Sequence, residues 1–209
     1  MAAVRRTGPV STCQLTVKAR SNSGSTVAQT WRVARYDPNR PSRPLDAGAL
    51  ERLALHYVGR YATTRAKLGS YLTRKIAERG WDGEAAAPIE ALVDRFAALG
   101  YVNDRIFAEA RAASLGRRGY GERRVGEALK AAGIDGNDAA AARAIARAGA
   151  HDAAMAFARR KRIGPFAGEE PDRDRCRRSL AAMLRAGHPF ELSRRIVEAM
   201  PGEEIEIES

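Results

Sequence analysis

The sequence predicts an all-α protein of three tandem trihelical repeats in an elongated, curved array, with a flexible basic N-terminal arm. Composition favours helices, because alanine supplies 41 of the 209 residues whereas aromatic residues make up only 6%, and thin alanine faces let helices pack closely. Apolar residues recur at helical spacing from residue 46 onward. Glycines at helix-ending positions 80, 133 and 187 recur at intervals of 53 and 54 residues, which indicates tandem units that pack on their neighbours.

The basic arm is predicted to span residues 1–45 and to lack a core of its own. It holds eight basic residues and one acidic residue, and it is rich in turn-forming Gly, Ser and Pro at 8–9, 21–25 and 38–44. Such a segment cannot bury enough apolar surface to order itself. Alternating apolar residues between 13 and 33 leave a marginal β-hairpin open as an alternative.

The first repeat is predicted at residues 46–101. Its first helix carries one apolar stripe, and Leu45 is placed to pack on Leu50 as a hydrophobic staple. The residues expected to begin or end its three helices are Asp46, Thr63 or Thr64, Gly80, Pro88 and Gly100. The residues expected to face its core are Leu50, Leu53, Ala54, Tyr57, Val58, Tyr61, Leu68, Tyr71, Leu72, Ile76, Ile89, Leu92, Val93, Phe96 and Leu99.

The second repeat is predicted at residues 102–149. Asn103 should cap its first helix, the break at 117–121 should end it, and a second helix should run to Gly133. Val125, Ala128, Leu129 and Ala132 are expected to form the buried face of that second helix. An alanine-rich third helix is expected from about residue 137 to residue 148.

The third repeat is predicted at residues 150–202, followed by an acidic tail at 203–209. Asp152 is expected to cap its first helix, which ends in four consecutive cations at 159–162. A loop bounded by Gly164-Pro165 and Pro171 should separate that helix from the next one, which starts at Asp172. The last helix should start at Pro189, with His188 as its cap.

The charge balance predicts an anionic partner. The chain carries a formal net charge of +11, of which +7 lies in the arm, +8 in residues 46–202 and −4 in the tail, and its pI is about 10.3. Such a balance favours nucleic acid ahead of a membrane surface as a partner.

Several functional classes lack support in the sequence. No apolar run approaches the roughly 20 residues of a membrane span, and no signal peptide is evident, so we expect a cytoplasmic protein with no membrane partner. Cys13 and Cys176 suggest neither a disulfide frame nor a metal site. The three histidines lack triad or metal spacing, and no phosphate-loop motif occurs. We therefore expect no catalytic activity and no cofactor.

Several motifs resemble those of the RecX regulatory proteins. They are residues 62–68 with Leu72 and Gly80, Gly-Tyr-x-x-Asp-x-x-Phe-Ala at 100–108, Arg-x-Gly-Tyr-Gly at 117–121, and Gly133-Ile134. The resemblance extends over roughly residues 45–200. It implies three trihelical repeats and a bacterial cytosolic protein that binds the RecA recombinase filament. It also implies inhibition of RecA ATPase and strand exchange, and hence restraint of recombinational repair and the SOS response.

Basic clusters near helix ends are the predicted partner-binding surface. Each cluster has a structural alternative, since cations at 159–162 also suit the negative end of a helix dipole, and Tyr120 can equally be a core residue between turn glycines. The predicted partner-binding residues are Arg117, Arg118, Tyr120, Arg123, Arg124, Lys130, Arg159, Arg160, Lys161, Arg162, Arg175 and Arg178.

The leading hypothesis is a monomer whose repeats lie along the groove of a RecA filament, with single- or double-stranded DNA as a further contact. One alternative is a sequence-tolerant DNA-binding protein that needs no RecA, because net positive charge alone gives non-specific affinity. Another is a helical-repeat adaptor for a different acidic protein.

Overall fold

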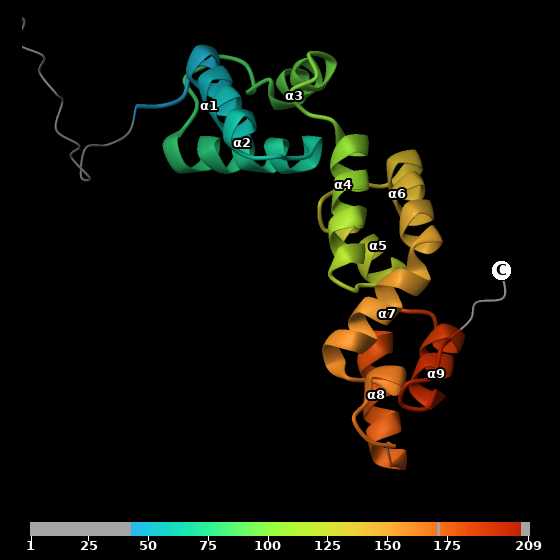
Figure 1. The fold of residues 1–209 in the computed structure, drawn as a ribbon. Helices are drawn as coiled ribbons and strands as arrows, with labels where there is room; N and C mark the ends of the chain where they lie inside the picture. Colours follow the sequence, from blue (N-terminus) through green and yellow to red (C-terminus); the bar gives the residue numbers. More distant parts are fainter. Residues whose placement is uncertain (1–42, 171, 206–209) are drawn as a thin grey trace, which may run out of the picture. The chain divides into compact units, whose positions relative to one another are not determined.

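The computed structural model describes residues 43–170 and 172–205, and it confirms the all-α class within them (Figure 1). The hairpin considered for residues 13–33, and Pro171, lie outside the described residues. The described part contains no β-strand, and its only β-type pairing is one isolated bridge between Leu45 and Trp81. The α-helices are α1 (Ala47–Arg60), α2 (Arg65–Arg79), α3 (Ile89–Ala98), α4 (Asp104–Arg117), α5 (Glu122–Lys130), α6 (Gly136–Ala148), α7 (Ala150–Lys161), α8 (Arg173–Arg185) and α9 (Phe190–Glu198), with a 3-10 turn η1 (Gly164–Phe166) before α8.

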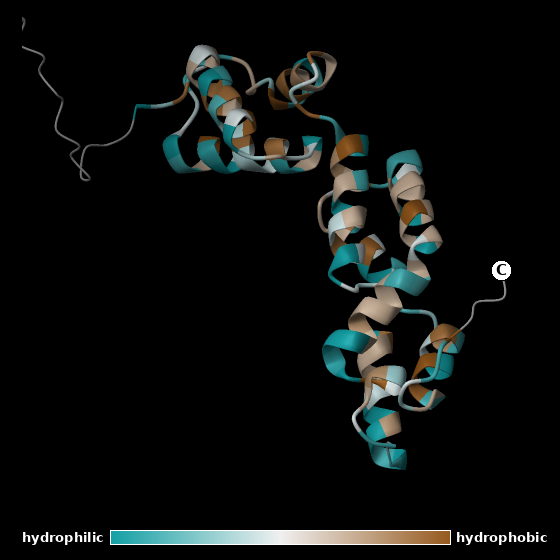
Figure 2. Ribbon diagram, in the orientation of Figure 1, coloured by the Kyte–Doolittle hydropathy of each residue, from teal (hydrophilic) through white to brown (hydrophobic). Residues whose placement is uncertain are grey.

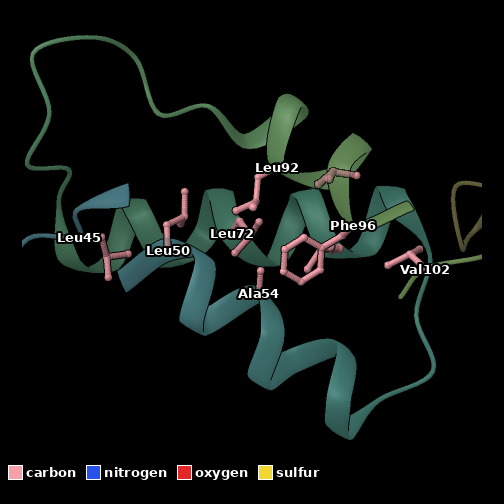
Figure 3. Packing of buried hydrophobic residues seen from close by; sticks show 9 residues of the cluster. Leu45, Leu50, Ala54, Leu72, Leu92, Phe96 and Val102 are labelled. Atoms are coloured by element: carbon pink, nitrogen blue, oxygen red, sulfur yellow. The ribbon is translucent and has the colours of Figure 1, made fainter. Parts of the chain in front are cut away.

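Three hydrophobic cores succeed one another in these helices. Helices α1–α3 enclose the first, α4–α6 the second and α7–α9 the third, and we call these helix groups modules 1, 2 and 3. In module 1, Leu50, Leu72, Leu92 and Phe96 converge from three helices (Figure 3). Brown apolar positions alternate with teal hydrophilic ones along the helices (Figure 2), as expected of helices that bury one face and expose another; α4 departs from this pattern, since its Ile106 is exposed.

The predicted N-caps at the start of four helices are confirmed. The side chains of Asp46, Thr64, Asn103 and Asp172 each accept a hydrogen bond from the backbone N–H three residues on, over 2.6, 3.2, 2.9 and 2.6 Å. Each bond satisfies a backbone donor that the helix itself leaves unpaired. Leu45 and Leu50 are both buried in the first core, as the staple requires.

The glycines of the predicted repeat close the middle helix of each module. Gly80, Gly133 and Gly187 have φ of 82°, 72° and 95°, a left-handed backbone that glycine adopts at little cost. The sequence pattern therefore identified these three helix ends correctly.

Some boundaries and core assignments were wrong. Helix α7 starts at Ala150, directly after Gly149, so Asp152 lies exposed in the first turn instead of capping it. Pro189, not His188, is the N-cap of α9. Tyr61 is 51% exposed and Leu99 63% exposed, because each is the C-cap of its helix, where the helical stripe no longer dictates which side is buried.

Candidate partner-binding surface

Several predicted site residues, but not Arg175 or Arg178, lie near the contact between modules 2 and 3, which we call the second junction. There the start of α5 lies against the end of α8. The Gly121 N–H donates to the Ala186 carbonyl oxygen at 3.0 Å, and the Arg123 N–H donates to the Gly187 oxygen at 3.3 Å. A Cβ on Gly121 would lie 2.3 Å from the Gly187 oxygen, so only glycine permits this approach.

Tyr120 and His188 fill the second junction. Tyr120 is half-buried and packs against both the second and the third core, which is the structural alternative considered for it. His188 is buried, and its Nε2 lies 3.1 Å from the carbonyl oxygen of Gly119 in the α4–α5 turn. Backbone hydrogen bonds and the side chains of half-buried Tyr120 and buried His188 thus join modules 2 and 3 at the junction.

The ends of α4 and α7 bring two predicted clusters together. The Arg160 guanidinium donates from Nη1 to the carbonyl oxygen of Arg118, 42 residues earlier in the chain. We call the combined set the α4–α7 surface. Its members are Arg117, Arg118, Arg159, Arg160, Lys161 and Arg162, all exposed.

The α4–α7 surface carries positive charge without local neutralisation. None of its six cations forms an ion pair with a carboxylate among the described residues. Aromatic rings orient two of them instead, since the Arg159 guanidinium carbon lies 4.9 Å from the Phe166 ring centre and that of Arg160 lies 5.4 Å from the Phe157 ring centre. Such cation–π contacts hold a guanidinium in place without cancelling its charge.

Arg162 occupies an unusual backbone conformation. Its φ of 54° is left-handed, and every other described residue with positive φ is a glycine. A side chain in this region costs about 1–2 kcal/mol relative to the right-handed form. The chain therefore keeps a cation at the C-cap of α7 where glycine would be more stable.

The remaining predicted residues lie elsewhere. Arg123 and Arg124 form ion pairs with Glu127 at 3.4 and 3.0 Å, and Arg123 also donates to the Leu184 oxygen. Lys130 ends α5. Arg175 lies in the first turn of α8 and Arg178 near its middle, and within the described residues no hydrogen bond or ion pair joins them to the α4–α7 surface.

The aromatic rings and the backbone conformation that position the cations of the α4–α7 surface were not predicted from the sequence. Phe157 stands three residues before Arg160, a helical spacing at which side chains meet, so that contact could have been anticipated. Phe166 lies beyond a turn of the chain, so its contact with Arg159 does not follow from helical spacing. No sequence pattern indicates the left-handed backbone of Arg162. In the described ranges no cluster of His, Cys, Asp and Glu could hold a metal ion, and no helix is long and apolar enough to cross a bilayer.

Comparison with known proteins decides the family. A regulatory protein RecX of Myxococcus xanthus strain DK1622 is 36% identical over 172 residues, which cover 78% of this chain and 91% of that protein. The chain belongs to the RecX family. A regulatory protein RecX of Agrobacterium fabrum strain C58 is 28% identical over 157 residues, covering 73% of this chain and 83% of that protein. No family profile matches the chain.

Solved RecX structures have a similar fold. The crystal structure of RecX from Lactobacillus salivarius superposes with a TM-score of 0.55 at 18% identity, covering 73% of this chain and 94% of that one. A second crystal structure of a regulatory protein RecX gives a TM-score of 0.52 at 15% identity, covering 72% of each chain. At these identities the likeness concerns the fold, and it agrees with the family assignment.

Proposed function

We propose that this RecX-family protein binds filaments of the RecA recombinase on DNA and inhibits their ATPase and strand-exchange activities. Membership of a family of regulatory proteins carries the proposal, and the motif resemblance supplies the partner. Such inhibition would restrain recombinational repair and the SOS response. The protein would act in the cytoplasm as a monomer and without chemistry of its own.

The α4–α7 surface supports an anionic partner. Six exposed cations without described ion pairs present guanidinium and ammonium donors to phosphate or to carboxylate. A RecA filament offers both, because it consists of protein wound on DNA. Binding one filament conformation more tightly than another would shift subunits toward that state and so change their hydrolysis.

The experiment is a titration of the full chain into RecA bound to single-stranded DNA, with the ATPase rate as the readout. We expect inhibition by the wild-type protein, and its absence at every ratio would refute the function. The decisive variant is Arg162→Gly. It should raise the concentration for half-inhibition by about 2- to 5-fold, the effect of one exposed charge contact.

The same variant should stabilise the protein by up to ~1 kcal/mol, because glycine relieves the left-handed backbone. This opposite effect on stability separates lost binding from misfolding. Arg52→Ala is the charge-matched control, since Arg52 is exposed on α1 and its loss should leave inhibition unchanged. Equal inhibition by Arg162→Gly and wild type would remove the α4–α7 surface from the proposal.

The second candidate, DNA binding without RecA, is favoured by the net charge of +11. Binding through phosphates alone should weaken by orders of magnitude between roughly 50 and 200 mM salt. A filament complex with additional protein contacts should persist over that range.

A further inference from the structure

A groove of about 490 Å³ borders the second junction, between α5, α6 and the turn into α9. Lys130 comes from α5 and Arg143 from α6, while His188 and Pro189 close the groove where α9 begins. It shares no lining residue with the α4–α7 surface. Its chemistry can therefore be considered separately from filament binding.

The groove has spare positive charge. Glu122 and Glu127 also line it, but both are engaged. Arg147 binds Glu122 through two bonds of 2.6 and 3.1 Å, and Glu127 is paired with Arg123 and Arg124. Lys130 and Arg143 have no recorded carboxylate partner in the described chain. Two cations thus face the groove uncompensated.

The backbone of α5 provides a seat for one of these cations. Gly126 is buried in the middle of α5, where glycine costs about 0.5–1 kcal/mol relative to alanine. A Cβ at this position would lie 3.0 to 3.3 Å from the Nε, Nη2 and Cζ atoms of Arg143. The absent side chain lets the planar guanidinium lie against the helix, which restricts its orientation before any ligand arrives.

Two further features lie where the groove meets the start of α9. Pro189 caps α9 without a side-chain hydrogen bond, so the first N–H groups of α9 have no side-chain partner and mark the positive end of the helix dipole. Buried His188 has an Nδ1 without a hydrogen-bond partner among the described residues.

We propose that this groove is an anion site that binds a phosphate group, supplied either by a DNA backbone or by a free phosphate compound. The fork-shaped guanidinium of Arg143 and the ammonium group of Lys130 match the several acceptor oxygens of a phosphate, and the positive end of the α9 dipole begins at the edge of the same groove. A carboxylate offers only two oxygens to the same donors. The site does not depend on the proposed regulation of RecA.

The experiment measures binding of two probes to the full chain in the absence of RecA. The probes are inorganic pyrophosphate and a fluorescent oligothymidylate, with polyglutamate as a competitor. Arg143→Gln should weaken phosphate binding about tenfold, the value of one charge-assisted contact. Gly126→Ala should weaken it in the same direction by displacing the guanidinium. Arg111→Gln is the matched control, because Arg111 is exposed on α4 and outside the groove.

The outcomes distinguish a DNA backbone from a free phosphate compound as the source of the bound phosphate. A tenfold loss for both probes, or for the oligonucleotide alone, supports the site with DNA as a ligand, and a loss for pyrophosphate alone supports a free phosphate compound. Equal binding by Arg143→Gln and Arg111→Gln would overturn the proposal. The proposal would also be overturned if Arg143→Gln weakened the binding of polyglutamate but not the binding of either phosphate probe. The groove would then bind acidic peptides. Circular dichroism melting of each variant confirms that it folds.

Discussion

At the residue scale, His188 is the clearest case of a side chain whose burial has a measurable consequence. Burial lowers the pKa of His188 below its usual value of 6.5, and its bond to Gly119 only partly opposes this effect. The unfolded chain therefore takes up a proton at a higher pH than the folded chain does. Linkage then requires the folded state to lose stability as the pH falls below about 6.5.

We predict that His188→Gln removes part of this acid destabilisation. The wild-type melting temperature should fall between about pH 7.5 and 5.5, and the fall should be smaller in the variant, since a neutral amide takes up no proton. His56→Gln is the control because His56 is exposed, and it should retain the wild-type dependence. Identical pH profiles for wild type and His188→Gln would contradict the prediction.

Single residues were predictable where their role is local. Asp46 and Asn103 were identified as N-caps because a cap bonds to an N–H three residues away. The role of His188 was missed, since its partner Gly119 is 69 residues away in sequence. The α4–α7 surface shows both cases: its charges were visible in the sequence, whereas the bond that joins Arg160 to Arg118 was not.

At the element scale, the start of α2 shows how one helix end serves two purposes. Thr64 is fully buried, and its hydroxyl oxygen caps α2 by accepting from the Lys67 N–H at 3.2 Å. The same hydroxyl donates to the carbonyl oxygen of Ala132, at the end of α5, at 2.7 Å. One side chain thus begins a helix of module 1 and binds module 2.

We predict that Thr64→Val lowers the free energy of unfolding by about 1–3 kcal/mol. Valine keeps the shape of threonine but leaves the Lys67 N–H and the buried Ala132 oxygen without their partner. Thr73→Val is the matched control, because the Thr73 hydroxyl bonds only within α2, to the Gly69 oxygen. Its effect should stay within ~0.5 kcal/mol. Urea denaturation of both variants gives the comparison, and equal losses would argue against a junction role for Thr64.

Helix boundaries were less predictable where two helices nearly join. A single residue, Gly149, is both the C-cap of α6 and the N-cap of α7. Asp152 has the side chain of a cap, so the sequence favoured a later start. The helical hydrogen bonds begin before it, since the Ala153 N–H donates to the Gly149 oxygen at 3.1 Å, and the local preference of Asp152 for a cap position does not set the start.

At the scale of the described chain, the middle helices of the three modules end in the same way. Their terminal carbonyl groups accept hydrogen bonds from another segment: Gly80 from the Leu45 N–H, Ala132 from Thr64, and Ala186 from the Gly121 N–H. For Ala132 and Ala186 the donor lies at the start of the middle helix of the preceding module, α2 and α5 respectively. In the first case Leu45 takes its place and forms a bridge with Trp81. The junctions therefore repeat, and Leu45 binds the Gly80 carbonyl, for which the described residues contain no preceding module.

This arrangement predicts that damage to one junction spreads only to the modules that meet there. Gly121→Ala would place a Cβ 2.3 Å from the Gly187 oxygen, and Gly133→Ala would place one 2.3 Å from the Ala66 Cβ at φ 72°. Overpacking of this kind costs about 1–3 kcal/mol. In Gly121→Ala, hydrogen exchange should accelerate in α4–α9 but not in α1–α3, and in Gly133→Ala it should accelerate in α1–α6 but not in α7–α9.

Gly116→Ala is the control for both variants, because Gly116 lies within α4 with nothing near its Cβ position. Alanine there should slow exchange slightly, since it stabilises a helix interior by about 1 kcal/mol relative to glycine. Accelerated exchange across all three modules in either junction variant would mean that the described chain unfolds as one unit. Acceleration confined to the neighbouring modules would mean that each junction stabilises only the pair it joins, so that a partner binding at the second junction can act on modules 2 and 3 while module 1 stays folded.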